Sequence, residues 1–196
     1  MLEIYTGDGK GKSTAAAGLA VRAAGHGIPV YYAQMLKDGT SGEMEVLKSL
    51  PSVRVFVADA FFGFTFRMTE EEKKREKEAL HKLLDDIRSA ICRNAAAGKS
   101  MSSGRGTAGK GGQRPSHCRP AALCVVDEVL TALARGMVDE KKVLAFLDAM
   151  PDNVETVFTG REGTEELSRR ADYVSVIRCE KHPYRNGIRA REGIEF

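Results

Sequence analysis

Short apolar runs alternate along the chain with longer segments in which apolar residues recur at helical spacing. The runs predict strands over residues 2–5, 28–33, 53–57, 122–126, 154–158 and 173–178. The segments between them predict helices over residues 15–24, 43–50, 143–147 and 165–170, and a longer helix that begins at Thr69. Most of the runs lack the alternation of a half-exposed strand, which is typical of a parallel sheet covered on both faces. The pattern therefore predicts an α/β fold with a mostly parallel sheet.

The long helix carries a start signal in its sequence. Thr69 and Glu72 have the spacing of a capping box, in which each side chain satisfies a backbone amide of the other residue. Five apolar residues then recur at helical spacing and are expected to face the core: Leu80, Leu83, Leu84, Ile87 and Ile91.

Residues 98–120 interrupt the alternation of strands and helices. The stretch is rich in Gly and Ser and has no apolar periodicity, so it cannot bury enough surface to offset its ordering entropy. We interpret it as a mobile insertion in a single domain of residues 1–196, with a lid or a nucleic-acid arm as the alternative. It holds five basic residues and no acidic one, so the rest of the chain has a net charge of −2 against +3 in total. Because the basic charge belongs to one segment, nucleic acid is not an expected partner.

The composition is typical of a globular protein, with 42% hydrophobic and 29% charged residues. No apolar run is long enough to span a membrane, and no basic and apolar leader precedes the first strand. The four cysteines form no C-x-x-C pair, which favours reduced thiols over a zinc site. Cys124 and Cys179 lie in apolar runs and are expected to be buried. We therefore expect a cytoplasmic protein with no membrane partner.

Residues 6–14, with the sequence TGDGKGKST, follow the first predicted strand and precede an Ala-rich helix. They match the phosphate-loop pattern G-x-x-x-x-G-K-[ST] at its last three positions, although Thr6 replaces the first glycine. Glycines let backbone amides turn towards one point, and the following helix adds the positive end of its dipole. A three-layer P-loop NTPase fold of the RecA-like kind is the expected architecture.

This loop predicts an ATP site. Lys12 would contact the terminal phosphates, and the Ser13 hydroxyl would ligate Mg²⁺ or Mn²⁺. Lys10 is either a second phosphate cation or a solvated side chain. The predicted nucleotide-binding residues of the loop are Gly7, Asp8, Gly9, Lys10, Gly11, Lys12, Ser13 and Thr14.

Asp127 and Glu128 directly follow the apolar run at residues 122–126. Carboxylates at the carboxyl end of such a strand are where P-loop proteins hold the metal or its water. The alternative is that both are acidic residues at the start of the next helix. Beside a phosphate loop the metal role is favoured for at least one of them, and the sequence does not distinguish which.

Several further segments accompany these motifs: QMLK at 34–37, GE at 42–43, GFTF at 63–66, TGR at 159–161 and the tail KHPYRNGIRAREGIEF. With the loop and helix YTGDGKGKSTAAAGLAVRAAGHG, they resemble the P-loop ATP:corrinoid adenosyltransferases, also called cob(I)yrinic acid a,c-diamide or cob(I)alamin adenosyltransferases. The resemblance covers nearly the whole chain apart from residues 98–120. Asp8 stands where that family usually has Asn, and Phe66 stands where Trp is usual.

The resemblance implies transfer of the 5′-deoxyadenosyl group of ATP to the Co(I) of a reduced corrinoid, with release of triphosphate, in adenosylcobalamin synthesis or salvage. The corrinoid would be cobalamin, cobinamide or cobyrinic acid a,c-diamide. Cob(I)alamin is already a strong nucleophile, so the enzyme has to orient C5′ of the ribose and stabilise a highly charged leaving group. Lys12 and Mg²⁺ would do this, and Arg161, beside a strand end, would add to the phosphate clamp.

Four aromatic residues occur within six positions at 61–66. Phe61 and Phe62 are expected in the core, whereas the resemblance implies that Phe64 and Phe66 face the corrin ring. There, an apolar wedge would exclude water and displace the lower cobalt ligand, which eases reduction of Co(II). An exposed aromatic cluster would be a liability without a ligand.

The resemblance also implies a flavoprotein reductant and a homodimer. Two other functions remain open: a P-loop small-molecule kinase or ATPase acting at the γ-phosphate, and a corrinoid carrier or nucleotide-binding regulator. The GFTF segment and the KHPY tail favour the adenosyltransferase, because a kinase has no use for them.

Overall fold

The computed structural model describes residues 1–63, 65–99 and 119–194, with residues 95–99 described by their backbone alone. Its centre is a six-stranded sheet in the order β3-β2-β4-β5-β1-β6, and the pairings within these residues are all parallel. The strands are β1 (Leu2–Thr6), β2 (Val30–Gln34), β3 (Val53–Val57), β4 (Ala122–Asp127), β5 (Val154–Thr159) and β6 (Tyr173–Val176). The predicted α/β fold is confirmed.

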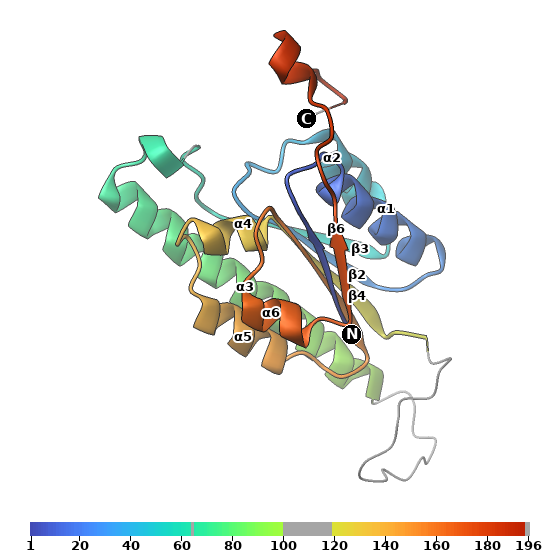
Figure 1. Ribbon diagram of the computed structural model, residues 1–196. Coiled ribbons are helices and arrows are strands. Elements are labelled where there is room, and N and C mark those ends of the chain that lie inside the picture. Colours follow the sequence, from blue (N-terminus) through green and yellow to red (C-terminus); the bar gives the residue numbers. More distant parts are fainter. Residues whose placement is uncertain (64, 100–118, 195–196) are drawn as a thin grey trace.

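Helices cover both faces of the sheet and complete three layers (Figure 1). One face packs on α1 (Lys12–Gly25) and α2 (Gly42–Ser49), and the other packs on α3 (Glu70–Lys99), α4 (Val129–Ala134), α5 (Glu140–Asp148) and α6 (Glu165–Arg170). Two short 3-10 turns, η1 (Thr65–Arg67) and η2 (Pro183–Asn186), lie outside these layers. Every residue of β2 and of β4 is buried, which is why neither run shows alternation in the sequence.

The helix α3 is the longest element and follows its sequence signals closely. The Thr69 amide donates to Glu72 Oε2 at 2.7 Å, and the Glu72 amide donates to Thr69 Oγ1 at 3.2 Å, so the predicted capping box is confirmed. The five predicted core residues of this helix are all buried. The helix continues to Lys99, so the first two positions of the predicted 98–120 loop are helical. Residues 100–118 of that predicted insertion lie outside the described residues.

The structure differs from the expectations at three points. Helix α4 lies outside the predicted helices, because its six residues make less than two turns and show no helical repeat. Cys124 is buried as expected, but Cys179 is half-buried, because it follows an exposed edge strand, β6, that ends at Val176. Phe62 packs against the core as expected, whereas Phe61 is 37% exposed.

The strand β6 forms an edge of the sheet and is exposed on both faces. The side chains of Tyr173, Val174 and Val176 keep 57%, 48% and 54% of their surface exposed. The chain after β6 passes the loop between β1 and α1 and ends in a segment that stands away from the sheet (Figure 1).

Candidate functional site

The loop between β1 and α1 curls around a lysine ammonium. Lys12 Nζ donates to the carbonyl of Gly9 at 2.7 Å, and the lysine is only 8% exposed. Burial lowers the pKa of Lys12, while Glu128, Asp8 and Asp127 oppose that shift. Gly7 and Gly11 have φ values of 108° and 119°, which side-chain-bearing residues rarely adopt. The predicted phosphate loop therefore has the backbone shape that its glycines allow.

Two neighbouring segments hold the loop in place. The Gly9 amide donates to the carbonyl of Ile177 at 2.8 Å, and the Gly7 amide donates to the carbonyl of Arg161 at 3.1 Å. A Cβ atom at Gly7 would lie 2.3 Å from the carbonyl oxygen of Ile177, so only glycine fits there. The segment after β5 and the segment after β6 thus fix the loop from its two sides.

Asp8 faces the segment after β6. Its Oδ1 accepts from the Cys179 amide at 3.0 Å, an interaction that joins residues 171 positions apart in the sequence. Lys10 and Thr14 are exposed, and Ser13 is half-buried in the first turn of α1. The nucleotide-binding roles assigned to these residues stay predictions.

The carboxyl ends of β4 and β5 carry a buried polar cluster. Thr159 Oγ1 donates to Asp127 Oδ1 at 2.6 Å, and Lys37 Nζ lies 3.1 Å from Asp127 Oδ2. Asp127 is completely buried, and both of its carboxylate oxygens therefore have partners. Burial lowers the pKa of Lys37, but Asp127 outweighs this effect, so the net shift is upward and the lysine stays charged. The cluster is an ion pair anchored by a hydroxyl group.

Glu128 differs from Asp127 in its surroundings. Its backbone has a φ of 64°, and its amide donates to Thr159 Oγ1 at 2.9 Å. Its half-buried side chain does not cap α4. Burial lowers the pKa of Lys12, and Glu128 opposes this shift more strongly than any other charged side chain, so the Glu128 carboxylate lies near the phosphate loop. Glu128 does stand at the N-cap position of α4, as the alternative of acidic residues at the start of the next helix placed it, but without a side-chain hydrogen bond to that helix.

The structure brings most of the predicted site residues to one end of the sheet. The carbonyl of Arg161 accepts from Thr6 Oγ1 at 2.9 Å, and its exposed side chain is a charged neighbour of Lys12. Phe66, on η1, is 77% exposed and stands outside the core, with the Arg67 guanidinium 5.5 Å from its ring centre. Phe64 lies outside the described residues.

Sequence reasoning assigned no role to Lys37, Thr159 or Gln34, although all three lie in this cluster. Gln34 is Asp127's partner in the β2–β4 ladder, and its side-chain Nε2 donates to Ser41 Oγ at 3.2 Å. Its Oε1 is buried and has no hydrogen-bond partner among the described residues. A polar residue ending an otherwise apolar run was the available signal for Gln34, and Thr159 likewise ends such a run.

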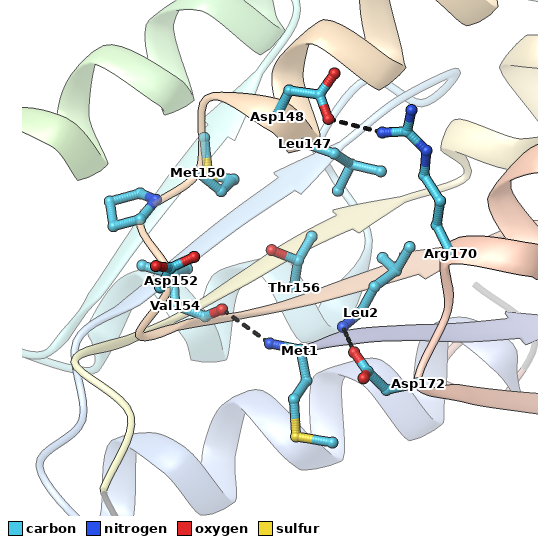
Figure 2. A pocket seen from close by; sticks show the side chains of 11 residues that line it. Met1, Leu2, Leu147, Asp148, Met150, Asp152, Val154, Thr156, Arg170 and Asp172 are labelled. Carbon is cyan, nitrogen blue, oxygen red and sulfur yellow. Dashed lines mark hydrogen bonds and ion pairs between the residues drawn. The ribbon is translucent and has the colours of Figure 1, made fainter. Parts of the chain in front are cut away.

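A hollow lies at the opposite end of the sheet from the phosphate loop. Figure 2 shows it between the starts of β1 and β5 and the ends of α5 and α6. Four of its polar groups form two pairs: Arg170 with Asp148 at 2.7 Å, and the Leu2 amide with Asp172 Oδ2 at 2.7 Å. These contacts join neighbouring elements of the fold. The candidate functional site is therefore the one at the carboxyl ends of the strands.

A metal ion at that site would have few protein ligands. Within residues 1–63, 65–99 and 119–194, no three His, Cys, Asp or Glu side chains gather to hold one. Mg²⁺ needs no such group, because it usually binds through one or two protein oxygens together with substrate phosphates and water. The Ser13 hydroxyl and the Glu128 carboxylate are hard oxygen donors of that kind. The residues present therefore fit Mg²⁺.

Fold and loop together define a class: an α/β protein whose glycine-rich turn and buried lysine form a P-loop for nucleotide phosphates. The family model "ATP:corrinoid adenosyltransferase BtuR/CobO/CobP" matches residues 1–196. The chain belongs to the ATP:corrinoid adenosyltransferase family.

Curated relatives agree with this family. A corrinoid adenosyltransferase of Sinorhizobium sp is 29% identical over 199 residues, which cover 100% of this chain and 80% of the relative. One of Pseudomonas aeruginosa is 29% identical over 197 residues, covering 100% and 83%. The corrinoid adenosyltransferase CobA of Salmonella typhimurium is 30% identical over 195 residues, covering 98% and 84%. No helix within the described part of the chain is long and apolar enough to cross a membrane.

Proposed function

We propose that this protein transfers the 5′-deoxyadenosyl group of ATP to the Co(I) of a reduced corrinoid and releases triphosphate. Cobyrinic acid a,c-diamide, cobinamide and cobalamin are the proposed acceptors. The observation that carries this proposal is the family match over the whole chain, with Lys12 buried inside a glycine loop at the carboxyl end of a parallel sheet. The fold and the family thus support the same class of reaction.

The proposed reaction is a displacement at carbon. The electron pair of Co(I) forms the Co–C bond to C5′, and the C5′–O bond breaks with its electron pair leaving on the triphosphate. No proton has to be removed from the nucleophile, so the protein's part is to orient C5′ and stabilise the leaving charge. Lys12 does this from within the loop, and Lys10 and Arg161 add positive charge from its rim.

We further propose that Glu128, with Ser13, holds Mg²⁺ or Mn²⁺. When bound, the ion would neutralise part of the triphosphate charge. Glu128 is the better ligand of the two neighbouring acids, because both carboxylate oxygens of Asp127 already contact Thr159 and Lys37. This proposal distinguishes the two carboxylates that the sequence left equivalent.

Phe66 is the proposed contact for the corrin ring, together with Phe64. A phenylalanine that is 77% exposed on a short 3-10 turn is an unusual surface feature, and an apolar ligand would cover it. The attachment of this segment to the fold supports the same role for Phe66. The neighbouring Phe62 amide donates to the buried Glu76 at 2.8 Å, which ties this segment to α3.

A homodimer, a flavoprotein reductant and a cytoplasmic location complete the proposal. The doubly exposed edge strand β6 supports a self-association surface, because such an edge offers unpaired backbone groups beside apolar side chains. The reductant follows from the chemistry, since Co(I) has to be made from Co(II) by a one-electron donor. The free thiols Cys92, Cys124 and Cys179 are consistent with a reducing compartment.

The identity of the product tests this function. The protein is incubated with ATP, Mg²⁺ and chemically reduced cobinamide. The products are separated by ion exchange, and the corrinoid is identified by absorbance spectroscopy. We expect triphosphate and adenosylcobinamide in equal amounts. Inorganic phosphate without adenosylated corrinoid would instead identify a kinase or ATPase, and binding of ATP without any product would identify a carrier or regulator.

A further inference from the structure

Two strained residues lie side by side at the carboxyl ends of neighbouring strands. Among the described residues other than glycine, Leu36 and Glu128 have left-handed backbones, with φ values of 54° and 64°. Leu36 follows β2, Glu128 follows β4, and these two strands pair so that Gln34 faces Asp127. Side-chain-bearing residues in this conformation are unfavourable, and they gather at functional sites where the surroundings over-determine them.

The strain at Leu36 has a visible result. Met35 and Leu36 are consecutive, yet both pack against the core on the α3 face of the sheet, which the alternation of a regular strand would forbid. The turn at Leu36 therefore shifts the alternation of side chains by one residue. As a result, Lys37 lies on the opposite face of the sheet, which packs against α1. Asp127 belongs to that face, since Val125 packs there and Val126 packs on the other side. The phosphate loop continues into α1 on the same face.

The ion pair that results is asymmetric. Asp127 is fully buried, while the side chain of Lys37 keeps 33% of its surface exposed. Asp127 is held by Thr159 on one oxygen and holds Lys37 with the other, which leaves the lysine further N–H groups for a ligand. A buried ion pair is weak support for stability, because desolvation offsets most of its attraction. The buried carboxylate of Asp127 instead fixes the position of the partly exposed Lys37 ammonium group.

The acidic pair lies between two lysines. Asp127 and Glu128 are charged neighbours of both Lys12 and Lys37, one on α1 and the other after β2. A polyphosphate bound at Lys12, with a cation held by Glu128, would therefore have a second lysine, Lys37, near it. Gln34 Oε1, beside Asp127, has no hydrogen-bond partner among the described residues. The polar cluster therefore still has an acceptor that a ligand could satisfy.

We propose that Lys37 is a second substrate-binding cation of this site, which hydrogen-bonds an anionic oxygen of the ATP polyphosphate, and that Asp127 is its positioning residue. The inference rests on the proposed function only for the identity of the reaction. A corrinoid side-chain carboxylate presents similar anionic oxygens, and the test separates the two sources.

The test uses Lys37→Met, Asp127→Asn and the double variant, with Lys48→Met as the matched control. Lys48 is an exposed lysine of α2 that also has a carboxylate partner, Glu45, at 2.7 Å. Dissociation constants of ATP and of inorganic tripolyphosphate are measured by calorimetry in the presence of Mg²⁺, and unfolding is followed thermally. Neither ligand measurement requires turnover, so a failure of the proposed function remains distinguishable.

We expect Lys37→Met to weaken ATP and tripolyphosphate alike by roughly tenfold to a hundredfold, the usual effect of one charge-assisted hydrogen bond. Asp127→Asn should weaken both ligands while Lys37 is present and have no further effect in the Lys37→Met background. The double variant should recover thermal stability without recovering affinity. If Lys37→Met alone does not fold, the affinity of the double variant is compared with that of Asp127→Asn instead. Lys48→Met should bind like the wild type.

Two results would overturn the proposal. Unchanged ATP and tripolyphosphate affinity in the Lys37 variants, with lowered thermal stability, would make the pair purely structural. A raised KM for cobyrinic acid a,c-diamide but not for cobinamide, with ATP affinity unchanged, would assign Lys37 to a corrinoid carboxylate instead.

Discussion

Single residues decide the chemistry of this site through what they are already bonded to. Asp127 and Glu128 are adjacent and chemically alike, yet one is buried with both oxygens partnered and the other faces the phosphate loop from a strained backbone. Lys12 is the cation that the loop encloses, with the Gly9 carbonyl as its partner. Its removal should therefore affect the reaction far more than the fold.

Lys12→Ala should lower adenosyl transfer by about a hundredfold or more, because it removes a preorganised charge from the leaving group. Circular dichroism should stay unchanged, since the side chain joins only the loop to itself. The measurement is triphosphate release with chemically reduced cobinamide, with Lys48→Ala as an exposed control. Transfer near the wild-type rate in Lys12→Ala would remove this residue from the mechanism.

The buried carboxylate of Glu76 makes a second prediction for a single residue. Glu76 is 1% exposed, its Oε1 has no partner among the described residues, and burial raises its pKa. The folded state therefore holds this proton more tightly than the unfolded state. By linkage, the residue's contribution to the free energy of unfolding falls as pH rises from the ordinary carboxyl pKa to the raised one.

Glu76→Gln should remove that part of the pH dependence. In urea titrations between acidic and neutral pH, the wild type should lose stability relative to Glu76→Gln as the pH rises. Glu78→Gln, an exposed change on the same helix, should follow the wild type at every pH. Parallel curves for wild type and Glu76→Gln would mean that Glu76 does not titrate differently on folding.

At the scale of elements, the turn η1 illustrates how secondary structure presents a side chain. Phe62 is held to α3 by Glu76 and by the Arg75 guanidinium 5.3 Å from its ring, and Met68 is buried at the other end of the segment. Between these anchors the chain turns outward and exposes Phe66. The element thus has fixed ends and an apolar residue outside the core.

Phe66→Ala should slow transfer on the order of tenfold when a flavoprotein supplies electrons, since burying a phenylalanine is worth about 1.5–3 kcal/mol. The same variant should approach the wild-type rate when a strong chemical reductant supplies Co(I). Phe66→Trp, the usual residue of the family, should keep or improve the flavoprotein-driven rate. Equal loss under both reductants would assign Phe66 to ATP binding or to stability.

At the scale of the whole molecule, the edge strand β6 is the surface that the fold leaves incomplete. It pairs with β1 on one side, and its other side and both faces lack cover within the described residues. Apolar edge strands of this kind associate unless charges protect them. This surface supports the proposed homodimer.

Val174→Lys combined with Val176→Lys should convert a dimer to a monomer, with the dissociation constant raised about tenfold or more by two like charges across the edge. Sedimentation velocity measures the change. Val46→Lys is the control, because Val46 is 56% exposed but lies on α2, away from this edge. A dimer that persists in the double variant would place the interface elsewhere.

The sequence by itself determined the strand positions, the phosphate loop and the family. These features rest on local patterns: apolar runs, glycines before Lys12 and the capping box at Thr69, whose physics acts within a few residues. The sequence also predicted that carboxylates after β4 would lie at the site, because parallel strands bring their carboxyl ends to one edge.

Only the tertiary structure decided which carboxylate is available, why Gly7 must be glycine and where Lys37 points. Each answer depends on a contact between distant residues: Asp127 with Thr159, 32 positions apart, Gly7 with the carbonyl of Ile177, and Lys37 with Asp127, 90 positions apart. Such contacts are set by the packing of whole elements across the sheet, and no local pattern encodes which partner a buried polar group will find.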